Sequence, residues 1–386
     1  IKIMKKEASD LKYSVVYPDK KRIQIIDNTT GKLMLLLNSE GNVKVTPKEV
    51  NGKVSSLQYK GKKYRGSIVM QSFEESDVTV INELSLDHYL YSVVPSEMPA
   101  SWHIEALKAQ AVAARNFALV TMGRHNAHGF DLCSTEHCQA YNGLAQENSN
   151  STEAVNATKG KVITYNGVLI SAFYHSSSGG HTEDSENVWG AKTDYIRGVE
   201  DKFSLGSPHD NWTVELNRAE LKEKLAQFGV DLGEIRDVRI LECSKFGRVT
   251  KLEVKGSKDT TVFEKEKIRS ILGTRLLKSI WYDLKTDADV FVRGSILNSA
   301  EKGRTSNMYV VSASGKTVVK GKGNKVSVKG MNDTKAYNVI PDKYTFDGKG
   351  FGHGLGMSQY GAKGMAEAGY NYQKILEHYY QNAKVQ

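Results

Sequence analysis

Two local patterns alternate along this sequence and together constrain its fold: short β-branched runs separated by turn residues, and one long segment of helix-forming residues. Runs such as RIQII at residues 22–26 and KLMLLL at residues 32–37 lie between Asn, Gly and Lys and predict strands. Residues 101–124 are instead rich in Ala, Leu, Lys, Gln and Arg, with apolar residues at helical spacing. Because helices lie between groups of strands that turns can join, we predict an α+β fold in which helices pack with antiparallel strand groups.

Capping and turn residues predict where several of these elements begin or end. Asp87 is predicted to cap a short helix, and Ser101 to cap the long one. The pair Asn166-Gly167 predicts a tight hairpin. Residues 315–330 alternate between Lys or Gly and β-branched residues, which predicts a solvated basic hairpin at the edge of the fold.

Length, charge and cysteine content exclude several classes of protein. With 386 residues, of which 39% are hydrophobic, the chain is long enough for about two to three globular domains. Its net charge of +9 favours an anionic partner, which could be a nucleic acid, an anionic membrane or an acidic polysaccharide.

No apolar run approaches the roughly 18 residues of a membrane helix. The chain begins at Ile1 and not at Met, so we expect that an upstream segment has been removed. Three cysteines are too few for a disulfide scaffold.

The first candidate for chemistry is Glu97, which lies between Pro95 and Pro99 in the turn VVPSEMP. The two prolines restrict the backbone around one carboxylate, and apolar neighbours surround it. Because a carboxyl in an apolar setting has a raised pKa, Glu97 suits the role of a general acid. The alternative is an acidic residue that only precedes the long helix and interacts favourably with its dipole.

The second candidate is one face of the long helix. Lys108 and Arg115 are seven residues apart and therefore aligned, with small residues between them, while Gln110 lies roughly opposite Lys108. Two cations beside small residues leave room for an anionic or polar ligand. A solvated basic face is the alternative.

Two further segments are rich in Ser, His and Gly: YHSSSGGHTED at residues 174–184 and GKGFGHGLGMSQYG at residues 348–361. Neither contains the G-x-S-x-G motif of serine hydrolases or the glycine pattern of nucleotide-binding loops. Ser and Gly at a strand end are typical of turns. The glycines of the second segment allow the backbone to approach a ligand closely, with His353, Ser358 and Gln359 as polar contacts.

The segment HNAHGFDLCSTEHCQAY contains a set of potential metal ligands, His128, Cys133, His137 and Cys138. Two imidazoles and two thiols suit a tetrahedral Zn²⁺, and four side-chain ligands leave no open position for water, so we expect a structural zinc. Adjacent His137 and Cys138 can both bind only if this segment is a turn, because neighbours on a strand point to opposite faces. A Cys133–Cys138 disulfide is the alternative outside the cytoplasm.

Taken together, three long motifs resemble the stage II sporulation protein D family. They are LDHYLYSVVPSEMPASWHIEALKAQAVAARNFAL at 86–119, AFYHSSSGGHTEDSENVWG at 172–190 and GFGHGLGMSQYGAKGMAEAGYNYQKILEHYY at 350–380. The resemblance implies a catalytic core assembled from the middle and the C-terminal end of the chain. We therefore predict four regions: a β-rich region at 1–80, the core with its Cys/His loop at 81–210, an accessory region at 211–345, and a glycine-rich loop with helices at 346–386 that completes the core.

The resemblance also implies an activity and a set of functional residues. Members that act in sporulation are lytic transglycosylases that degrade peptidoglycan while the forespore is engulfed, and their core is similar to that of amidase-enhancer wall proteins. They are extracytoplasmic and anchored to the mother-cell membrane by an N-terminal helix, which we expect this chain to have lost. The resemblance assigns the essential acid to Glu97. It assigns substrate contacts to Ser96, Lys108, Gln110, Arg115, Tyr174, Ser177, Ser178, His353, Ser358 and Gln359.

One carboxyl group is sufficient for the reaction that the resemblance implies. Protonated Glu97 would donate its proton to the glycosidic oxygen between MurNAc and GlcNAc, and the resulting carboxylate would take a proton from the MurNAc 6-hydroxyl, which closes a 1,6-anhydro ring. Lys108 and Arg115 would suit the lactyl carboxylates of peptide-stripped glycan. The expected partners are glycan strands, a sporulation cell-wall amidase and membrane proteins of engulfment, and not nucleic acid. The alternative function is a non-catalytic wall-binding scaffold that stimulates an amidase.

Overall fold

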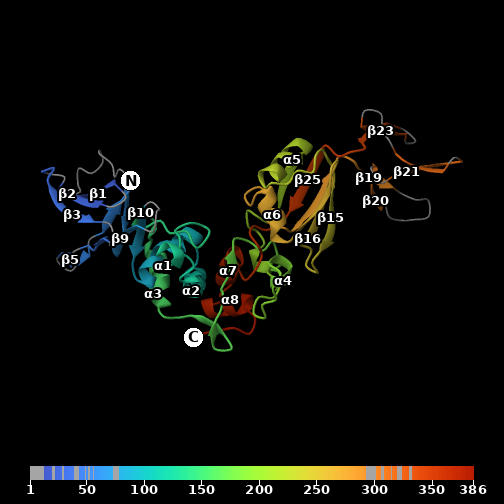
Figure 1. The fold of residues 1–386 in the computed structure, drawn as a ribbon. Coiled ribbons are helices and arrows are strands. Elements are labelled where there is room, and N and C mark those ends of the chain that lie inside the picture. The colour runs from blue at the N-terminus through green and yellow to red at the C-terminus, as the bar shows by residue number, and fades with distance from the viewer. Residues whose placement is uncertain are drawn as a thin grey trace. The chain divides into compact units, whose positions relative to one another are not determined.

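The chain folds into two compact units (Figure 1). The first contains residues 1–172, 365–377 and 382–386, and the second contains residues 173–364 and 378–381. Helices and antiparallel strand groups occur in both, so the predicted α+β class is confirmed. The chain first passes from the first unit to the second after residue 172. The four regions expected from the sequence stay a prediction. The computed structural model describes residues 13–19, 22–27, 30–38, 43–47, 49–50, 53–54, 56–72, 78–292, 301–305, 308–313, 315–319, 324–329 and 333–386.

Strands fill the described N-terminal part of the first unit. They form two three-stranded sheets, in the orders β1-β2-β3 and β10-β9-β4, and two small hairpins, β5-β6 and β7-β8. Three buried residues, Val43, Ile68 and Met70, form the core under the second sheet. The strands are β1 (Tyr13–Asp19), β2 (Arg22–Asp27), β3 (Leu33–Asn38), β4 (Val43–Val45), β5 (Glu49–Val50), β6 (Lys53–Val54), β7 (Leu57–Tyr59), β8 (Lys62–Tyr64), β9 (Ser67–Ser72) and β10 (Val78–Glu83).

Three helices, α1 (Leu86–Glu97), α2 (Ile104–Thr121) and α3 (Ser149–Ala157), pack together after these strands. Two predicted caps are wrong. Ser85 rather than Asp87 caps α1, by accepting a hydrogen bond from the His88 N–H. His103 rather than Ser101 caps α2, because its imidazole Nδ1 accepts from the backbone two residues later. Alanines give α2 a narrow surface that is buried almost all round, as expected of a helix at the centre of a domain.

A small sheet closes the first unit. Its strands β11 (Ile163–Tyr165) and β12 (Val168–Leu169) form the predicted hairpin, and both turn residues have the positive φ of a tight two-residue turn, 49° at Asn166 and 79° at Gly167. Strand β27 (Lys384–Val385) pairs with the other edge of β11. The end of the chain therefore completes the first unit.

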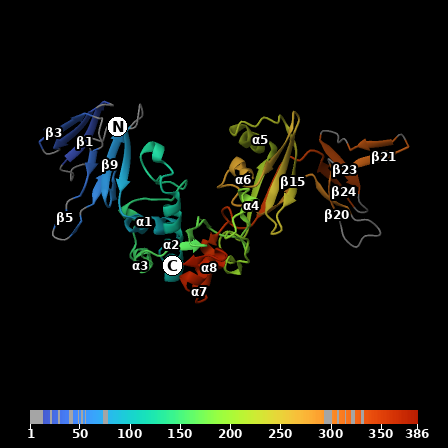
Figure 2. The same cartoon turned by 60° about the horizontal axis from the view of Figure 1, so that its bottom comes forward.

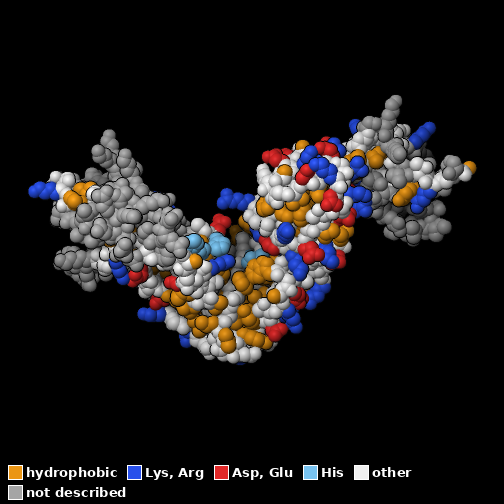
Figure 3. Space-filling view, viewed as in Figure 1, with side chains coloured by type: hydrophobic (Ala, Val, Ile, Leu, Met, Phe, Trp, Pro, Cys, Tyr) orange, Lys and Arg blue, Asp and Glu red, His pale blue; other side chains and the backbone are white. Residues whose placement is uncertain are grey.

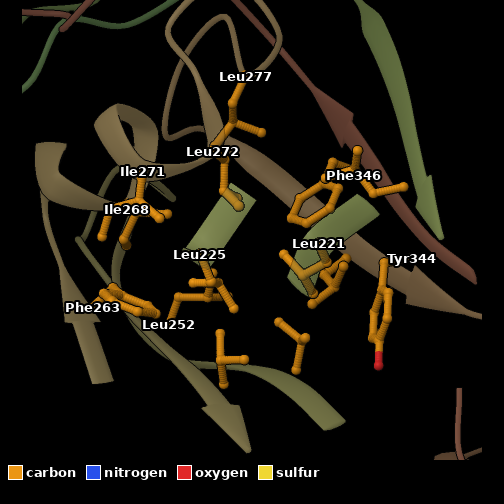
Figure 4. Packing of buried hydrophobic residues seen from close by; sticks show 14 of the residues in the cluster. Leu221, Leu225, Leu252, Phe263, Ile268, Ile271, Leu272, Leu277, Tyr344 and Phe346 are labelled. Atoms are coloured by element: carbon orange, nitrogen blue, oxygen red, sulfur yellow. The ribbon is translucent and has the colours of Figure 1, made fainter. Parts of the chain in front are cut away.

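A hydrophobic core of the second unit lies between two sheets and two helices (Figure 4). The sheets have the orders β14-β25-β18 and β15-β16-β17. Asn217 and Glu220 form a reciprocal capping box at the start of α5 (Arg218–Gln227), which turns the apolar side of this helix onto the core. Its partner α6 spans Glu266–Leu272. The strands are β14 (Trp212–Asn217), β15 (Ile235–Cys243), β16 (Val249–Gly256), β17 (Thr260–Glu264), β18 (Tyr282–Thr286) and β25 (Lys343–Gly348).

Three two-stranded hairpins are inserted between β18 and β25 (Figure 2). The predicted single hairpin over residues 315–330 is wrong, because its two halves pair with strands outside it. Alternation identifies strands but not their partners, and each half has a nearer partner across a short turn. The hairpins are β19 (Asp289–Val292) with β20 (Glu301–Arg304), β21 (Tyr309–Ser312) with β22 (Gly315–Val318), and β23 (Lys325–Lys329) with β24 (Thr334–Asn338).

The Ser/Gly-rich segments of the sequence meet inside the second unit. Strand β13 (Tyr174–His175) pairs in parallel with β26 (Met357–Ser358), although these segments lie far apart along the chain. The short helix α4 (Ser185–Val188) follows β13. Two C-terminal helices, α7 (Gln359–Glu367) and α8 (Tyr372–Tyr379), contribute residues to both units.

Candidate functional site

Glu97 is the last residue of α1 and lies half-buried beside the buried side chains of Val93, Val94 and Met98. The helix continues through Pro95, so Glu97 ends a helix and does not lie in the predicted turn. Burial raises the pKa of the Glu97 carboxyl, a backbone hydrogen bond from Ala140 opposes the rise, and the charge of Glu136 adds to it. The net direction is upward, as the sequence predicted for a carboxyl in an apolar setting.

Residues 138–142 hold this end of α1 in place. The Ala140 N–H donates to Glu97 Oε1 at 3.2 Å, and the Asn142 N–H donates to Ser92 Oγ at 3.2 Å. Between them, the Tyr141 hydroxyl donates to the Asn82 side chain at 2.7 Å. The Ser96 hydroxyl donates to the Ser92 carbonyl, so its hydrogen bond is made within the helix. The carboxyl of Glu97 is thus oriented by a loop that follows the cysteines.

Four potential metal ligands converge on the loop that leads into this segment. One ligand atom from each of His125, Cys133, His137 and Cys138 lies within 4.8 Å of the other three. Three of the predicted residues are therefore together, but His125 takes the place predicted for His128. The imidazole of His125 stacks on Phe130 and faces inward, whereas the helical turn Asn126–His128 leaves His128 exposed.

Three sulfur–nitrogen distances in this cluster fit a tetrahedral zinc ion. Bonds of about 2.3 Å to sulfur and about 2.0–2.1 Å to nitrogen place the sulfur and nitrogen ligands of such an ion about 3.6 Å apart. The Cys133 Sγ lies 3.6 Å from His137 Nδ1, and the Cys138 Sγ lies 3.7 Å from the same nitrogen and 3.4 Å from His125 Nε2. The backbone turns here, with the Cys138 N–H donating to the Thr135 carbonyl, so adjacent His137 and Cys138 can face the same point.

The two thiols of the cluster are free, and their environments differ. Burial acts to raise the pKa of Cys133, but hydrogen bonds from Thr135 and His137 outweigh it and bring the pKa below its usual range. A thiolate is the form that binds metal. Cys138 is buried and its pKa is raised, chiefly by burial. No metal would have an open position among four such ligands, so its role here would be to order the loop.

The cations predicted on the long helix have protein partners within the first unit. Lys108 is partly exposed and its Nζ donates to Glu105 Oε1 at 2.7 Å. Arg115 is 2% exposed, donates to the backbone carbonyls of Lys161 and Val155, and lies 3.6 Å from the Asp87 carboxylate. Gln110 is also fully buried. Arg115 therefore lies neither on an open ligand-binding face nor on a solvated basic face, the two alternatives predicted from the sequence. Its guanidinium is buried and is bound by other residues of the first unit.

The serines of the second unit form a buried hydrogen-bond network around Asp201. Ser178 Oγ donates to one carboxylate oxygen of Asp201 at 2.7 Å, and the Tyr379 hydroxyl donates to the other at 2.8 Å. The Ser358 hydroxyl accepts from the N–H groups of Ser178 and Gly361. Burial raises the pKa of Asp201 despite these hydrogen bonds. Ser178 and Ser358 are completely buried, so their hydroxyls join the β13 and β26 segments; a direct substrate contact by them stays a prediction.

The remaining predicted residues of this unit lie around β13. Ser177 Oγ is 3.1 Å from Ser207 Oγ and is buried, as is most of Gln359, whereas Tyr174 is half-buried. The His353 Nδ1 accepts from the Leu355 N–H at 3.0 Å, and burial together with nearby arginines lowers its pKa to about 3.

The glycine-rich loop approaches protein backbone and not an open surface. A side chain at Gly356, whose φ is +65°, would meet the Phe173 carbonyl oxygen at 2.1 Å, and one at Gly354, with φ +81°, would meet the guanidinium of Arg248. The close approach that the structure shows is to another part of the same unit, and an approach to a ligand stays a prediction.

Several residues of these arrangements carried no signal in the sequence. Arg248, just before β16, is 1% exposed and donates to the carbonyls of Ser178 and His181, which fixes the turn between them. No local pattern singled out Asp201 or Ala140, because their hydrogen-bond partners are distant in the sequence. His125 is the exception, because it lies near the cysteines in the sequence and could have been included among the potential ligands on that ground alone.

Comparisons with known proteins agree with this structure. A family model described as Stage II sporulation protein matches residues 74–165, which contain Glu97, the long helix and the Cys/His loop. These residues are therefore similar to the stage II sporulation protein family. A second model, for a domain of unknown function, matches residues 206–299.

Relatives extend the similarity beyond the stage II sporulation protein domain. The Stage II sporulation protein D of Bacillus subtilis is 28% identical over 324 residues, which are 79% of this chain and 75% of that protein. An Amidase enhancer of the same organism is 36% identical over 299 residues, 75% of this chain, and this match spans 39% of the relative's own length. An uncharacterized protein of Brachyspira hyodysenteriae is 27% identical over 96% of this chain and 86% of its own length. The predicted resemblance is confirmed. Among the described residues, no helix is both long and apolar enough to cross a membrane.

Proposed function

We propose that this protein is a lytic transglycosylase that cleaves the MurNAc–GlcNAc bond of peptidoglycan, with Glu97 as its acid and base. The observation that supports the proposal most directly is the carboxyl of Glu97, half-buried at the end of α1 with a raised pKa. A carboxyl that stays protonated at higher pH can donate a proton to a leaving glycosidic oxygen. The family match and the named relatives support a cell-wall role in sporulation.

The surroundings of Glu97 suit both halves of this reaction. While the carboxyl is protonated, its proton goes to the glycosidic oxygen as the bond to the sugar carbon breaks. The carboxylate that remains is stabilised by the Ala140 N–H at 3.2 Å, and it then accepts the proton of the MurNAc 6-hydroxyl as that oxygen bonds to the same carbon. No water enters the products. Ordinary glycosidases need a second carboxylate to act on water or on the sugar, and this reaction does not.

We further propose that His125, Cys133, His137 and Cys138 hold a structural zinc ion. The ion would supply no chemistry of its own. It would tie Cys138 to the earlier part of the loop, and Cys138 is two residues before the Ala140 N–H that contacts Glu97. The cluster would therefore act on the reaction only by positioning Glu97.

Digestion of purified, peptide-stripped glycan strands tests the proposed reaction. Mass spectrometry of the products from the wild-type chain should show new 1,6-anhydro-MurNAc ends. Glu97→Gln keeps the shape and the acceptor for Ala140 but has no proton to donate, so it should lose at least 99% of the rate, about a hundredfold. Glu136→Gln is the matched control, because it removes a neighbouring exposed carboxylate and should keep most of the activity. Retention of activity by Glu97→Gln would reject Glu97 as the acid.

A non-catalytic scaffold that stimulates a cell-wall amidase is the second candidate function. Its support is the 36% identity to a protein named Amidase enhancer. In that case the wild-type chain would produce no anhydro ends, and adding it to a purified amidase with intact sacculi would increase the release of stem peptides. Glu97→Gln would stimulate as well as the wild type, which distinguishes the two functions.

The place of action follows from the same proposal. We propose that the protein works outside the cytoplasm, on the glycan strands between the membranes of the sporulating cell, held there by an N-terminal anchor. An amidase that strips stem peptides and membrane proteins of the engulfment machinery are the proposed partners.

A further inference from the structure

The lysine-rich stretch of the sequence is not used by the proposed reaction, although it concentrates much of the charge of the chain. Residues 309–338 contain six lysines, no arginine and one acidic residue, Asp333, so this segment has a net charge of +5 when the whole chain has +9. The lysines are Lys316, Lys320, Lys322, Lys325, Lys329 and Lys335. Lys320 and Lys322 lie outside the described residues.

The hairpin β23-β24 presents some of these lysines on one face. Side chains alternate along a strand, so Lys325, Ser327 and Lys329 point to the same side, and all three are exposed. Their cross-strand partners are Asn338, Ala336 and Thr334, which add no acidic group and no large apolar side chain. On the hairpin β21-β22, the Lys316 ammonium lies 4.0 Å from the centre of the Tyr309 ring. Blue side chains project from the described parts of these hairpins in Figure 3.

The lysines of the hairpins differ in their pairing from several surface lysines of the same unit. On or beside the two large sheets and α5, Lys222 pairs with Glu234, Lys251 with Glu242 and Lys258 with Asp231, whereas Lys224 and Lys255 have no such pair among the described residues. Within the described residues, Lys316, Lys325 and Lys329 have no carboxylate within 4.0 Å, and only Lys335 has one, Asp333. The charge of the hairpins is therefore available to an external anion.

We propose that the hairpins β21-β22 and β23-β24 form a binding surface for a flexible phosphodiester polyanion of the cell wall, of the poly(glycerol phosphate) type. Lysine ammonium groups on flexible stems suit a mobile chain of phosphates, whereas rigid bidentate recognition uses arginine. The lysine face of β23 carries no aromatic residue on which bases could stack and no apolar residue that could enter a membrane. On the other hairpin Tyr309 is exposed, but the Lys316 ammonium lies over its ring. A polymer with a charge in every repeat releases counterions when it binds several lysines, which makes multiple weak contacts sufficient. This function is separate from glycan cleavage: it would hold the enzyme in the wall.

A salt series on the full chain tests the surface. The probe is purified poly(glycerol phosphate) on a sensor, and the variant is Lys316→Gln, Lys325→Gln and Lys329→Gln combined. Each lysine lost should reduce the slope of log affinity against log salt by about 0.7, so the slope should fall by about 2 and binding at 0.15 M salt should weaken about 50-fold. The matched control, Lys222→Gln, Lys251→Gln and Lys258→Gln combined, loses the same charge from paired positions and should bind as the wild type does.

Two measurements keep the result interpretable. The three hairpin lysines changed to arginine should retain binding, and all variants should have the melting curve of the wild type because the changed side chains are exposed. Equal weakening in the control would overturn the proposal in favour of general charge attraction. Equal or tighter binding of the wild type to phosphate-free sacculi, phosphatidylglycerol vesicles or single-stranded DNA, lost in the same variant, would assign the surface to another partner and also overturn it. Glycan cleavage by the hairpin variant should be unchanged on soluble strands.

Discussion

At the scale of single residues, effects of opposite sign act on the pKa of the Glu97 carboxyl. Burial and the charge of Glu136 raise its pKa, and the Ala140 N–H lowers it. A group whose pKa is raised by folding favours the folded state while it is protonated, and this contribution is lost as the pH rises through the folded pKa. The feature that supports Glu97 as an acid therefore also destabilises the protein at neutral pH.

Thermal melting across pH measures this cost. Glu97→Gln removes the buried charge but keeps an acceptor for Ala140, so the variant should melt at a higher temperature than the wild type at pH 7. The difference should shrink as the pH falls and vanish below about pH 3, where the carboxyl is protonated in both the folded and the unfolded chain. A lower melting temperature of the variant at all pH values would contradict the raised pKa.

The raised pKa of Glu97 also predicts how the rate of cleavage depends on pH. Activity should fall as the pH rises through the pKa of Glu97. Glu136→Gln removes a charge that raises this pKa, so the alkaline limb of the profile should move to lower pH while the maximum rate stays similar. A limb that does not move would mean that Glu97 does not set the profile.

Arg115 and Lys108 provide a contrast on one helix. Arg115→Ala should lower the free energy of unfolding by about 3 kcal/mol, because it leaves Asp87 without its close partner and removes the hydrogen bonds to the Lys161 and Val155 carbonyls. Lys108→Ala loses a partly exposed pair with Glu105 and should cost only about 0.5 kcal/mol. Chemical denaturation gives both values. If Lys108→Ala cleaves glycan poorly while its stability is unchanged, the lysine contacts substrate; if Arg115→Ala keeps its stability, the internal role described for it is wrong.

At the scale of elements, the loop from His125 to Ala140 connects a metal-ligand cluster to the candidate acid. His125→Ala should reduce the zinc content of protein purified without added metal from about one ion per chain to a small fraction, because three ligands bind more weakly than four. His128→Ala is the matched control and should keep the metal, since His128 is exposed. Elemental analysis and thiol titration give the result, and Cys133 and Cys138 should react fully only after chelation.

Other outcomes of that experiment are equally informative. A metal-free chain whose mass is two hydrogens low would show the Cys133–Cys138 disulfide and would end the zinc proposal while leaving Glu97 in place. Zinc lost from His128→Ala and kept by His125→Ala would restore the ligand set predicted from the sequence. Chelation should also slow glycan cleavage, because the segment that contains Ala140 would lose its tie to the loop.

At the scale of the whole molecule, the predicted functional residues are divided between two units with different chemistry. Glu97 and the Cys/His cluster belong to the first unit, together with the matched stage II sporulation protein domain. The Ser/Asp network and the glycine-rich loop belong to the second, as do the lysine-bearing hairpins. Cleavage and attachment to the wall are thus proposed for separate parts of the chain, which is why each can be tested by variants that leave the other unchanged.

Local patterns in the sequence determined the elements and the identity of the candidate acid. Helical spacing and alanine content predicted α2, Asn166-Gly167 predicted its hairpin, and the apolar neighbours of Glu97 predicted the direction of its pKa. These features depend on residues within a few positions of one another, so propensity and periodicity are sufficient to find them. The family resemblance came from long motifs in the same way.

Only the tertiary structure decided which residues face one another. It selected His125 over His128 because a short helical turn directs one imidazole inward and the other to solvent. It placed Arg115 inside the first unit, because its partners come from segments about 30 to 45 residues away that no local pattern connects to it. It likewise divided the lysine-rich stretch between two hairpins. Contacts of this kind depend on packing between elements, and the period of a strand or a helix carries no information about its neighbour.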